Sequence, residues 1–226
     1  VGLRDGIEVH APRGRAGRPR DLRPVFQLRH RQVRNAGPIS ELAGPNGTVA
    51  PGAVAAAAAT AVPPVVVGNK AIALKLCRNV VIKDITLFMG GHFALLATGV
   101  DNLTIDNVKV DTNRDGFDID ACRNVRIANC SVNSPQDDGI VLKSSYALGF
   151  ARATENVTIT NCQLSGYDPG TFLDGTFQRT LERAPDRDGP TGRIKFGTES
   201  NGGFKNISIS NCVFDRCRGL ALETVD

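Results

Sequence analysis

The chain has 226 residues, of which 41% are apolar and 22% charged, and its formal net charge is +4. This composition is typical of a soluble folded protein and excludes a chain that is disordered throughout. It contains no uninterrupted apolar run of about 18 residues, so the sequence predicts no membrane span. The chain starts at Val1 without a signal peptide, and we interpret it as a piece or processed form of a longer protein.

The first 62 residues differ in composition from the rest. Residues 1–70 hold ten Arg/Lys against four Asp/Glu, a net +6, while residues 71–226 hold seventeen against nineteen, a net −2. Clustered arginines can neutralise nucleic-acid phosphates, but Pro and Gly interrupt this run and no binding motif accompanies it. We therefore interpret residues 1–62 as a basic, low-complexity segment that packs irregularly, and we expect neither a nucleic-acid nor a membrane partner.

From Leu76 onward one pattern returns five times, as RNVVIKDITL, DNLTIDNVKV, RNVRIANCSV, ENVTITNCQL and KNISISNCVF. Each copy alternates apolar and polar residues with the period of a β-strand. The steps between copies are 23, 22, 32 and 50 residues, which indicates a repeat of 22 to 23 residues with two insertions. We expect residues 63–226 to form an all-β parallel β-helix with one coil per repeat. The second residue of every copy is asparagine: Asn79, Asn102, Asn124, Asn156 and Asn206.

A second strand follows each copy, as HFALLATG, GFDIDAC, GIVLKSS, RIKFGTE and GLALETV. Equivalent residues of successive coils should lie about 4.8 Å apart. Counting two residues back from the first inward residue reaches four equivalent positions in successive coils: Asp115, Asp138, Gly192 and Arg218. We align the inward apolar pairs of the five strands as Phe93/Leu95, Phe117/Ile119, Ile140/Leu142, Ile194/Phe196 and Leu220/Leu222.

This register brings three carboxylates to one level. Asp115 stacks with Asp138, and Asp137 lies beside them in the same turn. One Asp before a strand is an ordinary turn residue, but three close together repel one another and raise at least one pKa. The cluster therefore favours a functional role. Ca²⁺ binding is a competing use of three acids.

At these residues the chain resembles the polygalacturonases, family 28 of the glycoside hydrolases, which are pectin-degrading right-handed parallel β-helices. The likeness rests on NRD at Asn113–Asp115, on QDD at Gln136–Asp138 and on the intervening CRNVRIANCSVNS, and it covers residues 63–226. It implies hydrolysis of a pectic, uronate-containing polysaccharide without a metal or cofactor, by a monomer that works outside the cell or in the periplasm.

The resemblance also implies roles for individual residues. Asp137 would protonate the glycosidic oxygen while Asp115 and Asp138 activate a water, which corresponds to inverting hydrolysis with acid and base ~6.5–9.5 Å apart. We expect the two neighbouring charges to keep Asp137 protonated near neutral pH. The neighbouring positions are assigned to substrate binding: Asn113, Gln136 and Lys143.

Two motifs of that family are displaced. Gly192 stands where the family has a histidine, and RIK occurs one coil early, in GRIKFGTES. We interpret Arg193, Lys195 and Arg218 as the groups that bind a substrate carboxylate, because guanidinium and ammonium groups suit a uronate.

Two rival functions belong to other classes. A carbohydrate-binding β-helix without activity would have the same repeat, and a polysaccharide lyase would use Ca²⁺ with Arg193 or Lys195 as the base. Cys130, Cys162 and Cys212 share one repeat position and predict an inward ladder of thiols rather than disulfides.

Overall fold

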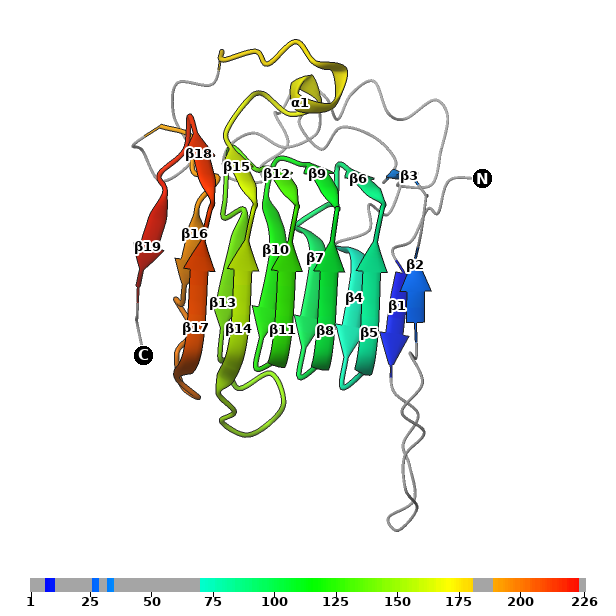
Figure 1. Cartoon of the computed structure of the whole chain (residues 1–226), viewed down its shortest axis with the longest axis vertical. Helices are drawn as coiled ribbons and strands as arrows, with labels where there is room; N and C mark the ends of the chain where they lie inside the picture. The colour runs from blue at the N-terminus through cyan, green and yellow to red at the C-terminus, as the bar shows by residue number, and fades with distance from the viewer. Residues whose placement is uncertain (1–6, 11–25, 29–31, 35–69, 181–188, 224–226) are drawn as a thin grey trace, which may run out of the picture.

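The computed structural model describes residues 7–10, 26–28, 32–34, 70–180 and 189–223 (Figure 1). These residues form nineteen strands and one short helix, α1 (Thr171–Asp174). The strands make three sheets in which all neighbouring described strands pair in parallel. The fold is therefore the expected all-β parallel β-helix. No helix in these ranges is long and apolar enough to cross a membrane.

Each coil contributes one strand to each sheet, so the strand numbers within a sheet rise in steps of three. Sheet A contains β1 (Ile7–His10), β4 (Lys70–Lys75), β7 (Phe93–Thr98), β10 (Asp115–Asp120), β13 (Ile140–Lys143), β16 (Ile194–Phe196) and β19 (Leu220–Leu222). Sheet B contains β2 (Phe26–Leu28), β5 (Arg78–Lys83), β8 (Asp101–Asp106), β11 (Arg123–Ala128), β14 (Thr154–Thr160) and β17 (Phe204–Ser210). Sheet C contains β3 (Gln32–Arg34), β6 (Thr86–Phe88), β9 (Lys109–Asp111), β12 (Ser131–Asn133), β15 (Gln163–Ser165) and β18 (Val213–Asp215).

The core is one continuous column of apolar side chains inside the coils. In sheet B, the inward residues of β8 and β11 pair as Leu103 with Val125 and Ile105 with Ile127, and all four are buried. Cys130 and Cys162 continue the column at the next corner as buried thiols, with Cys212 half-buried above them. All three are free thiols, as the sequence predicts.

The recurring asparagine is the second or third residue of β5, β8, β11, β14 and β17 and has a left-handed backbone conformation, with φ between 52° and 58°. Asparagine adopts this conformation more readily than most residues. Its side chains also form a ladder, because each Nδ2 donates to the Oδ1 of the coil before, from Asn102 to Asn79 at 2.9 Å up to Asn206 to Asn156 at 3.0 Å. Backbone geometry and side-chain bonding together explain why the repeat specifies Asn.

Two sequence expectations need correction. The inward pair of β7 is Leu95/Ala97, because Phe117 pairs with Leu95, so the predicted pair Phe93/Leu95 was out of register by two residues. The N-terminal segment, residues 1–62, is not wholly separate from the β-helix. Its strands β1, β2 and β3 pair with β4, β5 and β6 and add to all three sheets. The other residues of the segment 1–62 lie outside the described ranges.

The insertion after β15 folds back over earlier coils (Figure 1). Asp111, at the end of β9, accepts hydrogen bonds from the backbone N–H groups of Gly170 at 2.9 Å and Leu173 at 3.0 Å. Asn133, at the end of β12, accepts one from the N–H of Tyr167 at 2.8 Å and donates to its carbonyl at 3.0 Å. Two buried polar residues of sheet C therefore hold the insertion.

Candidate active site

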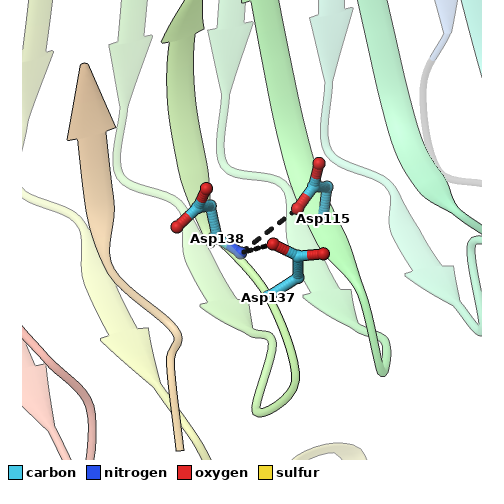
Figure 2. A group of neighbouring side chains, drawn as sticks. All are labelled: Asp115, Asp137 and Asp138. Atoms are coloured by element: carbon cyan, nitrogen blue, oxygen red, sulfur yellow. Dashed lines mark hydrogen bonds between the residues drawn. The ribbon is translucent and has the colours of Figure 1, made fainter. Parts of the chain in front are cut away.

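Three aspartates meet where sheet C passes into sheet A (Figure 2). Asp115 is the first residue of β10, and Asp137 and Asp138 lie in the turn between β12 and β13. Close contact of the two turns depends on glycine, because a Cβ on Gly116 would lie 2.3 Å from the carbonyl oxygen of Gly139. A glycine follows the aspartate in both coils, as Gly116 after Asp115 and as Gly139 after Asp138. These glycines let successive coils stack tightly beneath the acids.

The three carboxylates lie close together. One oxygen from each lies within 4.8 Å of the others, and the backbone N–H of Asp138 points at Asp115 Oδ1 (3.2 Å) and at Asp137 Oδ1 (3.1 Å) (Figure 2). The sequence register thus predicted the meeting of these acids. Their oxygens lie closer together than the ~6.5–9.5 Å that separates the carboxyl groups of inverting enzymes.

The three acids differ in their cations. Asp137 pairs with Arg114 at 2.8 Å, and Asp138 pairs with Arg193 Nε at 2.6 Å and with Lys195 Nζ at 3.5 Å. Asp115 has Lys143 Nζ at 3.9 Å, but that ammonium lies only 2.7 Å from Asp118.

These surroundings separate the pKa values. Burial, the charges of Asp118 and Asp137 and a hydrogen bond with Asp137 raise the pKa of Asp115 to about 10. Burial also acts to raise the pKa of Asp137, but hydrogen bonds with Asp115 and Arg114 outweigh it and lower that pKa. The expectation that Asp137 holds the proton is therefore wrong. The resting proton belongs to Asp115, because Arg114 stabilises Asp137 as an anion.

Asp138 is buried, and burial raises its pKa although Arg193 and Lys195 oppose the shift. Its carboxylate, like that of Asp137, is already neutralised by protein cations. Ca²⁺ would have to compete with these groups for the same oxygens, and it needs six to eight oxygen ligands. The described residues therefore suit proton transfer better than Ca²⁺ binding.

The comparisons with known proteins support the architecture. A family model described as "Right handed beta helix region" matches residues 66–181, slightly more than half of the chain. The chain belongs to the right-handed β-helix family. A search of the curated proteins finds no match. Among solved structures, the chain is similar to the "Catalytic domain of GH87 alpha-1,3-glucanase in complex with nigerose", with 14% identity and a TM-score of 0.35, covering 70% of this chain and 38% of that chain.

In this right-handed β-helix the predicted cationic residues divide into two groups. Arg193 and Lys195 both reach Asp138, and both also hold Glu223, at 2.9 and 3.0 Å. Arg218 instead contacts the insertion, where its Nη2 donates to the carbonyl oxygen of Gly189 at 3.3 Å. Strand register still places Arg218 one coil beyond Gly192, and its role in binding a substrate carboxylate stays a prediction.

No side chain fits at position 192, where the resemblance to polygalacturonases predicts a histidine. Gly192 has φ +49°, and a Cβ there would lie 2.4 Å from the carbonyl oxygen of Ser165. Asn113 and Gln136 lie in the two stacked turns, where the N–H of Gln136 donates to the carbonyl oxygen of Asn113 at 2.9 Å. Lys143 lies against both Asp115 and Asp118, as described above.

Besides Arg114 and Glu223, three further residues lie at this site that the sequence analysis did not assign to it. Asp118 is fully buried beside Lys143. Phe93 pairs with Asp115 in the sheet, and its ring lies 5.6 Å from Lys143 Nζ. His92 precedes it, and burial, the charge of Arg114 and those of two lysines lower its pKa although Asp137 opposes them.

Proposed function

We propose that this right-handed β-helix is a glycoside hydrolase that cleaves a uronate-containing polysaccharide of the pectic type. The observation that supports the proposal best is the different surroundings of three neighbouring carboxyls. Burial and nearby anions raise the pKa of Asp115 to about 10, while Asp137 and Asp138 each have a cation of their own. Glycoside hydrolysis needs this combination of a carboxylic acid and a carboxylate.

Asp115 and Asp137 form the acid of the reaction as a hydrogen-bonded pair that shares one proton. The side chain of Asp137 is 27% exposed and that of Asp115 is 6% exposed. Asp137 therefore presents the proton to the glycosidic oxygen, and Asp115 stores it. This assignment keeps Asp137 as the contact to substrate and moves the resting proton to its neighbour.

Asp138 acts as the base that activates a water. Its side chain is only 5% exposed and is tied to Arg193 and Lys195, so it is poorly placed to attack a sugar carbon itself. A water held by Asp138 would attack instead, with inversion at the anomeric carbon. The short spacing of the acids makes the configuration of the product a direct test of this step.

The preference for a uronate is supported by the way Arg193 and Lys195 hold Glu223. Its carboxylate receives Arg193 Nη1 at 2.9 Å and Lys195 Nζ at 3.0 Å, and its side chain is 40% exposed. The two cations, which also contact Asp138, therefore already bind one exposed carboxylate. A substrate uronate would displace Glu223 and take over these contacts.

Replacing Glu223 by Gln should strengthen binding of acidic substrate. The neutral amide competes less for Arg193 and Lys195, so KM for a uronate oligosaccharide should fall about 2- to 5-fold, the scale of an exposed ion pair. KM for a neutral oligosaccharide of equal length is the control and should not change. A rise in both KM values would show that Glu223 supports the site rather than occupying it.

The test of the proposed function is product analysis on a panel of pectic and neutral polysaccharides. Hydrolysis releases new reducing ends without ultraviolet absorbance, and NMR of the first product should show the inverted anomer. An unsaturated, absorbing product would mean a lyase. Saturable binding of a pectic chain without cleavage would mean a binding module, and either result would overturn the hydrolase.

A further inference from the structure

Asp118 is a carboxylate in an unusual place. It lies between Phe117 and Ile119 on β10, and because those two side chains face the core, Asp118 lies on the outer face of sheet A. Its exposure is nevertheless 0%. A charged residue on the outer face of a strand is ordinarily solvated. The burial of Asp118 therefore requires a neighbouring opposite charge and an explanation.

The counter-charge is Lys143, from the adjacent strand β13. Its Nζ lies 2.7 Å from Asp118, 3.9 Å from Asp115 and 4.0 Å from Glu199, and it faces the Phe93 ring at 5.6 Å. The ammonium therefore stands nearest to Asp118 although Asp115 is within reach.

We propose that Asp118 is a positioning residue of the hydrolase: by drawing Lys143 to itself, it leaves Asp115 without a close cation and so keeps the proton on Asp115. The proposal rests on the proposed function, because stored acid matters only if a proton is transferred. Asp118 need not touch substrate.

The charges around Asp115 support this role. From its own strand it faces Asp118, from the following turn Asp137, and from β13 Lys143. Two of these three groups are anions, which disfavour ionisation of Asp115, and the only cation is engaged elsewhere. Burial acts in the same direction as the two anions.

A purely structural ion pair explains the arrangement less well. Burying two charges costs several kcal/mol in desolvation, and apolar pairs of similar volume often stabilise proteins more. The pair instead lies beside Asp115, which shares this lysine with Asp118 and has its ammonium at 3.9 Å rather than 2.7 Å. When the Asp118 carboxylate is removed, we expect Lys143 to pair with Asp115 instead.

Asp118→Asn is the test variant. Without its carboxylate, Lys143 should pair with Asp115, and the apparent pKa of Asp115 should fall by about 1–3 units, the range typical of a neighbouring charge. The pKa is read by NMR titration of the labelled Asp115 carboxyl, which requires no activity. In active enzyme, the alkaline limb of kcat/KM should move to lower pH by the same amount.

The double variant D118N/K143M removes the released ammonium as well and should return the pKa of Asp115 toward the wild-type value. Lys143→Met alone, which serves if D118N does not fold, should leave this pKa unchanged or higher. Asp106→Asn is the matched control. It breaks the Lys83–Asp106 pair on sheet B, which is 2.6 Å long against 2.7 Å for Lys143–Asp118, and should leave the pKa of Asp115 unchanged.

An unchanged Asp115 titration in folded D118N, or a lower pKa in K143M, would overturn the inference while leaving the hydrolase intact. If the NMR shift occurs in a protein that cleaves nothing, the proton placement stands and the proposed function fails. The two failures are therefore distinguishable.

Discussion

Asp137 shows how a single arginine can reverse an assignment made from sequence. Two adjacent acids suggest that the more crowded one is protonated, but Arg114 lies in the same ladder position one coil earlier and stabilises the anion. In the proposed mechanism the proton therefore rests on Asp115 and reaches Asp137 through their hydrogen bond.

Asp137→Asn should reduce kcat roughly 10²- to 10⁴-fold, the usual weight of general acid catalysis. The amide keeps the shape but cannot pass on the proton, so substrates with a very good leaving group should lose less. Steady-state kinetics on a natural chain and on an activated glycoside measure the difference. Asp106→Asn, far from the cluster on sheet B, is the control, and equal losses on both substrates would contradict the role of acid.

Asp115→Asn should stabilise the protein at alkaline pH while removing activity. The folded-state pKa of Asp115, about 10, lies above the value near 4 of an unfolded chain. Its contribution to stability is thus complete below about pH 4 and is lost as the pH rises toward 10. The neutral amide avoids that loss.

Thermal unfolding at two pH values checks this sign. We expect the Tm of Asp115→Asn to exceed that of the wild type by at least about 2–4 °C at pH 8, equivalent to ~1 kcal/mol in a chain of this size, and to show no gain at pH 4. A gain at pH 4 that vanishes at pH 8 would mean that Asp115 is ionised in the folded protein.

At the scale of elements, the insertion depends on one buried acid at the end of β9. Asp111 receives backbone N–H groups of Gly170 and Leu173 and the Nδ2 of Asn133. Asp111→Ala leaves these donors without their acceptor, at a cost of about 1–3 kcal/mol for each buried group.

Hydrogen exchange should locate this loss in the insertion. The amides of Gly170 and Leu173 should lose at least about tenfold protection in Asp111→Ala, while those of β11 keep theirs. Asp84→Ala, which removes an exposed ladder acceptor for Asn107, is the control and should leave the insertion unaffected. Uniform loss across all three sheets would show that Asp111 supports the coils rather than the insertion.

The elements also show what sequence reasoning can reach. The repeat predicted the strands of sheets A and B because each buried residue alternates with a polar one, and the register from Phe117 to Leu222 followed directly. The register of β7 failed because Phe93 is apolar yet lies beside Asp115 at the site rather than in the core. An apolar residue used in this way has no signal in a single sequence.

The sequence predicted which aspartates meet at the site but not which of them holds the proton. Strand register places Asp115 beside Asp138, and it needs no side-chain geometry. Which acid holds the proton depends on where Arg114, Lys143 and Arg193 direct their long side chains. These flexible side chains can reach several partners, so the pattern alone could not choose among them.

For the whole molecule, the coils differ in how well they are covered. Ile119 and Ile140, in the middle of sheet A, are fully buried, whereas Leu220 and Leu222 on β19, the last described strand, are 53% and 74% exposed. In stacked repeats each coil contacts only its neighbours. β19 pairs with β16, which contains Lys195 and follows Arg193, so these two cations lie in the coil next to the last described strand.

The asparagine ladder bears on how such a protein can change over generations. Every described rung from Asn79 to Asn206 repeats one residue, one backbone conformation and one side-chain bond to the rung before. A duplicated or deleted coil brings or removes its own rung, so the bond pattern closes again without compensating substitutions elsewhere. The steps of 32 and 50 residues mark coils that have accepted extra chain between unchanged rungs. Length and loops can thus vary by recombination while the spacing that brings the aspartates together is inherited intact.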